Sequence, residues 1–242
     1  RWNVTAGAPL ARYYDFWRAT QLGYLGNMIY PARAGEVIRM AAIRSFAGIS
    51  AGEAVASAIA DRISDGLLLG LMLTGMFLGS GWHSISAAMA VTVAGTFGMA
   101  ALALYCFVRW GDRWAGKRLA PILVGFAPLR DRQRLGWIMF LGIVAFSFDF
   151  LALFVLLRAF GWEVPFLAAV TLEIFLAAGS SIPSTPGYVG VYQVACVLAL
   201  GFYGVDDSQA VAFSVVWQIV LLIIFILQGG WVALHYGIGR YR

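Results

Sequence analysis

The sequence SQAVAFSVVWQIVLLIIFILQGGWVALHYGIG, residues 208–239, contains no Asp, Glu, Lys or Arg. Residues 82–108 and residues 174–205 also lack all four residue types. A helix of about 20 apolar residues crosses the hydrocarbon core of a bilayer, and each of these stretches is longer than that. We therefore predict an integral membrane protein whose chain crosses the bilayer several times as α-helices.

The composition supports the same class of protein. Hydrophobic residues make up 61% of the chain and charged residues 12%, whereas soluble domains have roughly half and a quarter. The mean hydropathy is +0.80. The net charge of +5 comes from short basic clusters between apolar segments, as topology signals do, so we do not predict nucleic-acid binding. Cys106 and Cys196 lack the spacing of a redox or zinc motif, and we predict neither a metal nor a cofactor.

The apolar segments predict an all-α fold, a polytopic transmembrane helix bundle in a single membrane domain that covers residues 1–242. Residues 19–32 are uncharged but too short to cross as a helix, so we predict a re-entrant segment that ends at Pro31. Longer helices are predicted at residues 52–79, 82–108, 136–158 and 208–236. Because the sequence begins with Arg1 and not with Met, we also expect that one or more helices precede it.

The basic residues predict the orientation of these helices. One connection, residues 109–134, holds seven of them: Arg109, Arg113, Lys117, Arg118, Arg130, Arg132 and Arg134. The opposite loops, near residues 80–84, 161–165 and 204–208, hold no Lys or Arg. Basic loops stay in the cytoplasm, so we predict that the 109–134 connection and the carboxyl terminus are both cytoplasmic.

A short motif occurs twice in the chain. Pro31-Ala-Arg-Ala-Gly35-Glu-Val37 is matched by Pro183-Ser-Thr-Pro-Gly187-Tyr-Val189, and Gly48 is matched by Gly204 further along. We predict one repeat over residues 9–79, a second over residues 164–236, and linking helices over residues 82–158. In the predicted orientation the two copies are inverted. Inverted repeats with broken helices are typical of transporters, whose substrate site lies near the point where the breaks meet.

Charged residues at membrane depth are the candidate site residues, because burying a charge there is costly. Glu36 and Arg39 are three residues apart, as are Arg62 and Asp65, so each pair can share a helix face. Two interpretations stay open for these residues and for Arg33. They are structural ion pairs, or the arginines bind a lipid phosphate through the two-pronged guanidinium group.

Two carboxylates stand apart from these pairs. Asp149 lies about halfway along the predicted helix 136–158, and Glu173 lies just before the second break. Each is a candidate proton or cation relay, and the open alternative is a packed carboxyl group that is protonated or paired with an arginine.

Four motifs in this order resemble the lysylphosphatidylglycerol synthase transmembrane-region family. They are Gly23-Tyr-Leu-Gly-Asn27, Pro31-Ala-Arg-Ala-Gly-Glu36-Val-Ile-Arg39, Asp61-Arg-Ile-Ser-Asp65 and Pro183-Ser-Thr-Pro-Gly-Tyr-Val-Gly190. The resemblance implies a multi-pass protein of a prokaryotic cytoplasmic (inner) membrane. Such a protein would be similar to the flippase half of the multiple peptide resistance factor, which moves aminoacylated phospholipids between leaflets. The aminoacyl-transferase domain of that factor has no counterpart here, so we expect no enzymatic activity.

The resemblance completes the set of candidate residues. The substrate-binding candidates are Asn27, Arg33, Glu36, Arg39, Arg62, Asp65, Asp149 and Glu173. The structural breaks are Pro31, Gly35, Pro183, Pro186, Gly187 and Gly190. The chain departs from the family pattern at Tyr188, where a glycine is usual, and at Gln193, where a glutamate is usual. Gln218 aligns with Arg62 of the first repeat, so charge is concentrated in the first repeat.

The leading hypothesis is a flippase-like protein that translocates a lipid whose head group is anionic or contains a phosphate, with aminoacylated lipids included in this class. The alternatives are an integral-membrane transferase that uses a lipid or a polyprenyl phosphate, and a non-transporting scaffold subunit of a lipid synthase. The partners implied are membrane lipids and, under the last hypothesis, a separate lipid synthase. The sequence does not predict the oligomeric state.

Overall fold

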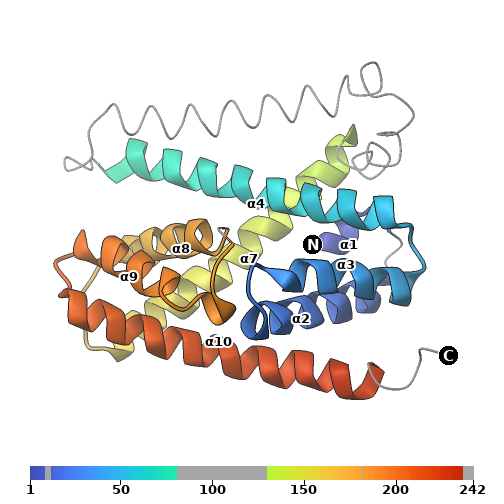
Figure 1. Ribbon diagram of the computed structural model, residues 1–242. Coiled ribbons are helices and arrows are strands. Elements are labelled where there is room, and N and C mark those ends of the chain that lie inside the picture. The colour runs from blue at the N-terminus through green and yellow to red at the C-terminus, as the bar shows by residue number, and fades with distance from the viewer. Residues whose placement is uncertain (9–11, 81–129, 182, 237–242) are drawn as a thin grey trace. The chain divides into compact units, whose positions relative to one another are not determined.

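The computed structural model describes residues 1–8, 12–80, 130–181 and 183–236, which form helices and turns without a strand (Figure 1). The all-α class is therefore confirmed for this part of the chain. The predicted helix 82–108 and most of the connection 109–134 lie outside it. The elements are α1 (Trp2–Thr5), α2 (Tyr13–Ile29), α3 (Ala34–Ala47), α4 (Ala51–Ser80), α7 (Arg132–Ala159), α8 (Phe166–Ser180), the 3-10 turn η3 (Pro186–Tyr188), α9 (Val191–Gly201) and α10 (Asp207–Tyr236).

Helices α7 and α10 are long and apolar enough to cross a membrane, with 28 and 30 residues. At about 1.5 Å of rise per residue, each exceeds the roughly 30 Å hydrocarbon core. Their bounds enclose the predicted helices 136–158 and 208–236. Helices α8 and α9 are apolar but shorter, because the chain is interrupted between them.

The chain divides into two compact units, and α7 contributes to both. Unit one contains residues 1–13 and 49–145. Within its described part, α1 packs against α4, and the Trp2 indole N–H donates to the Ser57 hydroxyl at 3.1 Å. Gly142 of α7 packs directly on the Leu68 side chain. Unit one is therefore held by contacts of α4 with α1 and with the start of α7.

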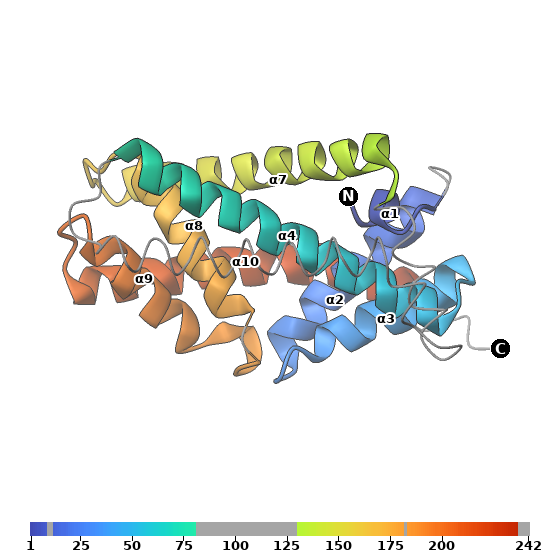
Figure 2. The ribbon, with the colours of Figure 1, turned by 90° about the horizontal axis from the view of Figure 1, so that it is seen from above.

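Unit two contains residues 14–48 and 146–242. It holds two helical hairpins, α2–α3 and α8–α9, together with α10. Figures 1 and 2 show the blue turn of the first hairpin next to the orange turn of the second. Helix α9 packs between α8 and α10. The core is apolar and centres on Leu153, Leu172, Cys196 and Phe213.

Each hairpin is interrupted by residues with a left-handed backbone. The first interruption separates α2 from α3 and includes Ala32 at φ 56° and Arg33 at φ 57°. The second separates α8 from α9 and includes Gly187 at φ 63°, Tyr188 at φ 60° and Gly190 at φ 87°. A side chain at positive φ is strained, and only glycine adopts such a backbone conformation without that strain.

The predicted break residues lie mostly in these two interruptions. Pro31 lies in the first, and Pro183, Pro186, Gly187 and Gly190 lie in the second. Gly35 belongs instead to the first turn of α3. A Cβ atom at Gly35 would come 2.0 Å from the Gly23 carbonyl oxygen, so this glycine allows α3 to approach α2.

After each interruption the chain runs through the same series of features. Helix α3 ends at the left-handed C-cap Gly48, at φ 64°, and α9 ends at Gly201, three residues before the left-handed Gly204 at φ 75°. An N-cap follows, Ser50 before α4 and Asp206 before α10, and each then begins a helix of 30 residues. The Ser208 hydroxyl and backbone N–H both donate to Asp206, which lowers the pKa of that carboxyl group.

A pair of adjacent glycines on α10 tests the packing of unit two. A Cβ atom at Gly229 would come 2.7 Å from both the Gln21 carbonyl oxygen and the Leu25 Cβ atom of α2, whereas a Cβ atom at Gly230 would meet nothing within 4 Å. We expect Gly229→Ala to lower the melting temperature in detergent, because α2 and α10 must move apart. Gly230→Ala should hold or raise it, since alanine favours a helix over glycine by about 1 kcal/mol. Equal shifts of the same sign would contradict the packing described here.

Candidate functional site

The charged candidates of the first repeat fall into two clusters, one in each unit. The Arg–Glu–Arg triad, Arg33, Glu36 and Arg39, lies in unit two at the start of α3. The Arg1 cluster lies in unit one and contains Arg1, Asp61, Arg62 and Asp65. Each cluster is described by itself.

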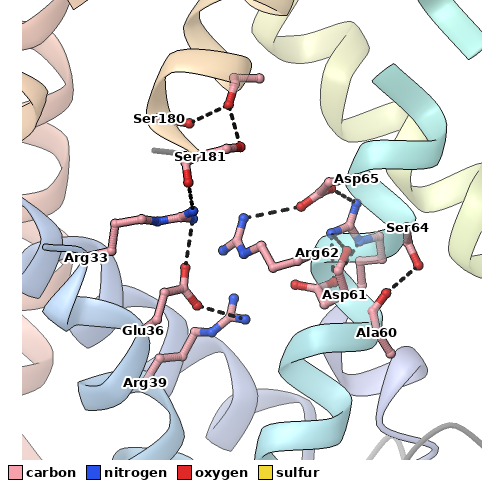
Figure 3. Close-up of polar contacts among 12 residues, drawn as sticks. Arg33, Glu36, Arg39, Ala60, Asp61, Arg62, Ser64, Asp65, Ser180 and Ser181 are labelled. Atoms are coloured by element: carbon pink, nitrogen blue, oxygen red, sulfur yellow. Dashed lines mark hydrogen bonds and ion pairs between the residues drawn. The ribbon is translucent and has the colours of Figure 1, made fainter. Parts of the chain in front are cut away.

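Glu36 is shared by the two arginines of the triad (Figure 3). Its Oε1 atom lies 3.5 Å from Arg33 Nη2, and its Oε2 atom lies 3.3 Å from Arg39 Nη2. The side chain of Arg39 is only 3% exposed, whereas those of Arg33 and Glu36 are each 20% exposed. Two guanidinium groups and one carboxylate give the triad a formal charge of +1, carried by its more accessible arginine.

Close packing of α2 and α3 buries the inner arginine of the triad. A Cβ atom at Gly23 would come 2.8 Å from the Arg39 Cβ atom, so only glycine leaves room for this side chain. Glu36 lies in the first turn of α3, where a negative charge is stabilised by the helix dipole. The position of Glu36 in the first turn of α3 therefore stabilises its carboxylate, and the arginines three residues before and after it pair with this carboxylate.

Asn27 of α2 lies beside the first turn of α3. Its side-chain oxygen would be 2.5 Å from a Cβ atom at Gly35. The residue is 6% exposed, and this oxygen accepts no hydrogen bond within the described part of the chain. Asn27 thus contributes a buried polar atom next to the triad, and burying such an atom without a partner costs about 1–3 kcal/mol.

The first hairpin also binds the second directly. An Arg33 Nη1–H group donates to the Ser181 carbonyl oxygen at 2.9 Å, and the Ala32 N–H donates to the Ser184 carbonyl oxygen at 2.9 Å. Ser181 is the C-cap of α8, at the negative end of that helix dipole. Arg33 therefore contacts both the carboxylate of its own hairpin and a carbonyl of the other.

Arg1 is the centre of the cluster in unit one, and sequence reasoning assigned it no role. Its Nε and Nη2 atoms donate to Asp61 Oδ1 at 3.0 and 2.7 Å, and its Nη1 atom pairs with Asp65. Arg62 pairs with Asp65 at 3.3 Å (Figure 3). Two arginines and two aspartates make a cluster with no net charge. The only feature of the sequence that could have predicted this role is the positive charge of Arg1, which can pair with Asp61 and Asp65 on one face of α4.

Asp149 and Glu173 lie on other helices than the triad. Asp149 is exposed near the middle of α7, and Glu173 is partly buried on α8. Both are within electrostatic range of Tyr192, whose ring stacks on Tyr188 at 5.1 Å. The relay hypothesis stays a prediction. In the described ranges, no group of three or more His, Cys, Asp or Glu side chains could hold a metal ion.

Two glutamines, Gln193 and Gln218, form a chain of hydrogen bonds with the second interruption. The Gly190 N–H donates to Gln193 Oε1 at 2.6 Å, Gln193 Nε2 donates to Gln218 Oε1 at 2.7 Å, and Gln218 Nε2 donates to the Gly187 carbonyl at 3.0 Å. An uncharged pair therefore ties α10 to the second interruption, where charged residues were usual or expected.

These features define a helical membrane protein with interrupted hairpins and a buried polar cluster at one of the interruptions. Residues 2–229 match the sequence pattern of the lysylphosphatidylglycerol synthase TM region. The chain belongs to this family of integral membrane proteins, whose role is related to lipids. The matched part is the transmembrane region of the synthase family. No curated protein and no solved structure matches the chain.

The burial of the Arg1 cluster predicts which arginine stabilises unit one. The Arg1 and Asp61 side chains are 15% and 7% exposed, whereas Arg62 is 37% exposed. Arg1→Met should lower the free energy of unfolding by about 3–5 kcal/mol, the usual cost of breaking a buried ion pair. Arg62→Met should lower it by about 0–1 kcal/mol. Chemical denaturation in detergent measures both, and a larger loss for Arg62→Met would contradict this assignment.

Proposed function

We propose that the protein binds a lipid with a phosphate-containing head group and translocates it between the leaflets of the membrane. The observation that carries this proposal is the net positive triad at the start of α3, in a chain of a lipid-related membrane family. A guanidinium group matches a phosphate geometrically, because two N–H groups can donate to two phosphate oxygens.

Within the triad, Arg33 is the proposed phosphate ligand and Arg39 has a supporting role. Arg39 pairs with Glu36 from the buried side, so Arg33 shares the carboxylate with a second arginine and the triad keeps a formal charge of +1. Arg33 has the more exposed side chain of the two. The Arg1 cluster is a poorer candidate, since its charges balance and its inner members are buried.

The architecture proposed for transport is a pair of inverted repeats. The series of interrupted hairpin, left-handed glycine, N-cap and 30-residue helix occurs twice in chain order. We propose that the interrupted hairpins are re-entrant. Irregular backbone at membrane depth is tolerated only inside protein or beside a water-filled cavity, and transporters place their substrate there.

The proposed location is a prokaryotic cytoplasmic membrane, with the start of α7 and the carboxyl terminus in the cytoplasm. Arg130, Arg132 and Arg134 before and at the start of α7 support this orientation. A cysteine at position 130 should resist an impermeant thiol reagent added to intact cells, and labelling from outside would contradict the orientation.

The transport proposal is tested with Arg33→Lys in liposomes. The family description makes lysylphosphatidylglycerol the first lipid to assay, with phosphatidylglycerol second. Lysine keeps the positive charge but loses the second N–H group that donates to the phosphate. Because a hydrogen bond to a charged group contributes about 1.5–3 kcal/mol, leaflet-resolved transport should fall at least about tenfold. The melting temperature in detergent should change little.

The matched control is Arg134→Lys, an exposed arginine that pairs with Asp131 at 3.5 Å. It should leave transport unchanged. Transport at the wild-type rate by Arg33→Lys would refute the phosphate-binding role. Absence of transport by the wild-type protein, together with co-purification of a lipid synthase, would favour the scaffold hypothesis instead.

A further inference from the structure

The turns of the two hairpins are joined by two hydrogen bonds that both end on carbonyl oxygens of the second hairpin. The backbone N–H of Ala32 donates to Ser184, and the guanidinium of Arg33 donates to Ser181, each at 2.9 Å. Figures 1 and 2 both show these turns side by side. Two neighbouring residues of one strained turn, Ala32 and Arg33, therefore bind the second hairpin through hydrogen bonds.

The donor side of this contact is a strained turn, which the first hairpin itself stabilises through the Ala34 N–H bond to the Pro31 carbonyl oxygen at 3.2 Å and the Arg33–Glu36 ion pair. Ala32 and Arg33 both adopt left-handed backbone conformations, at φ 56° and φ 57°. A residue other than glycine in this region costs on the order of 1–3 kcal/mol. Ala32 is also exposed, so burial of its side chain does not offset the cost. Loss of the two hydrogen bonds would leave this turn free to relax.

Of the two hydrogen-bond donors in this contact, the Arg33 guanidinium group is the one that a ligand can bind in place of the second hairpin. Its Nε atom is buried without a hydrogen-bond partner in the described part of the chain. Its Nη1 atom is bound only to a neutral carbonyl oxygen, and Nη2 lies 3.5 Å from Glu36. Hydrogen bonds to a charged acceptor are roughly twice as strong as those to a neutral one, so a phosphate competes well with the Ser181 carbonyl.

We propose that these two hydrogen bonds form a latch between the hairpins, and that a lipid phosphate opens the latch by taking Arg33 from Ser181. The proposal rests on the proposed function, because it uses the same arginine as the phosphate ligand. A ligand shifts such an equilibrium only by its difference in affinity for the two states. Here the difference arises because Nε of the Arg33 guanidinium is buried and Nη2 faces Glu36, so a phosphate and the Ser181 carbonyl oxygen compete for Nη1.

The latch is tested by disulfide formation between Ala32→Cys and Ser184→Cys, in a chain that also carries Cys106→Ala and Cys196→Ala. A backbone hydrogen bond between residues 32 and 184 brings their Cα atoms into the range that a disulfide spans. The probes are dioleoylphosphatidylglycerol and dioleoylglycerol, which differ only in the phosphoglycerol group. The first should slow oxidation by copper phenanthroline several-fold, and the second should have no effect. Adding Arg33→Gln should remove the effect of the phospholipid.

The control pair lies within the second hairpin. A Cβ atom at Gly179 would lie 3.9 Å from the Ala195 Cβ atom, so Gly179→Cys and Ala195→Cys can also form a disulfide. Neither lipid should change its rate of formation. The oxidised 32–184 protein should lose lipid transport and regain it on reduction.

A second measurement needs no substitution. In the wild-type protein, hydrogen exchange at the Ala32 amide should be slow without lipid and several-fold faster with phosphatidylglycerol, because the bond to Ser184 is released.

The outcomes separate the two proposals. If native mass spectrometry shows phosphatidylglycerol binding that depends on Arg33, while oxidation and exchange rates stay constant, the latch is refuted and the proposed function stands. Transport by the oxidised protein would also refute the latch. If binding does not depend on Arg33, the phosphate site fails and the latch fails with it.

Discussion

Interrupting a helix leaves backbone N–H and C=O groups without their partners inside the helix, and unit two must satisfy these groups by other hydrogen bonds. In the first interruption, the Ala32 N–H is satisfied by the second interruption, because it donates to the Ser184 carbonyl oxygen. The second interruption is further satisfied from α10, since Gln218 donates to the Gly187 carbonyl. Each break is therefore stabilised by another part of the same unit.

The charged groups follow from how closely the hairpin helices pack. Glycines at positions 23 and 35 bring α2 and α3 so near that Arg39 is buried against α2. A buried guanidinium needs an anionic partner, and Glu36 supplies it one turn earlier on α3. The outer arginine, Arg33, shares the same carboxylate, so the three side chains together keep one excess positive charge near the point where the hairpins meet. Packing, pairing and net charge are thus consequences of one close helix contact.

Much of the fold was predictable because apolar length is a strong signal. Helices α7 and α10 begin and end within a few residues of their predicted bounds, and the two breaks lie at the motifs around Pro31 and Pro183. Sequence periodicity could not show where helices approach each other. Close helix contacts occur, for example, at Gly23, Gly35 and Gly229, whereas a Cβ atom at Gly66 of α4 would meet nothing within 4 Å in the described chain.

The candidate site was predictable only in part, because partners distant in sequence decide it. The pairing of Arg62 with Asp65 could be predicted from their spacing and is present, but the more buried Arg1, some 60 residues away, also binds Asp65 and Asp61. The replacement of charged residues by Gln193 and Gln218 was evident from the motifs, whereas their mutual hydrogen bond was not.

The central claim, that Arg33 binds a lipid phosphate, is tested most directly by phosphorus–nitrogen dipolar recoupling in solid-state NMR. The sample is protein with nitrogen-15-labelled arginine in phosphatidylglycerol bilayers. The account predicts that lipid phosphorus dephases a guanidinium signal, and that Arg33→Lys removes this dephasing while Arg134→Lys preserves it. Dephasing that survives in Arg33→Lys, or that is absent from the wild-type protein, would contradict it.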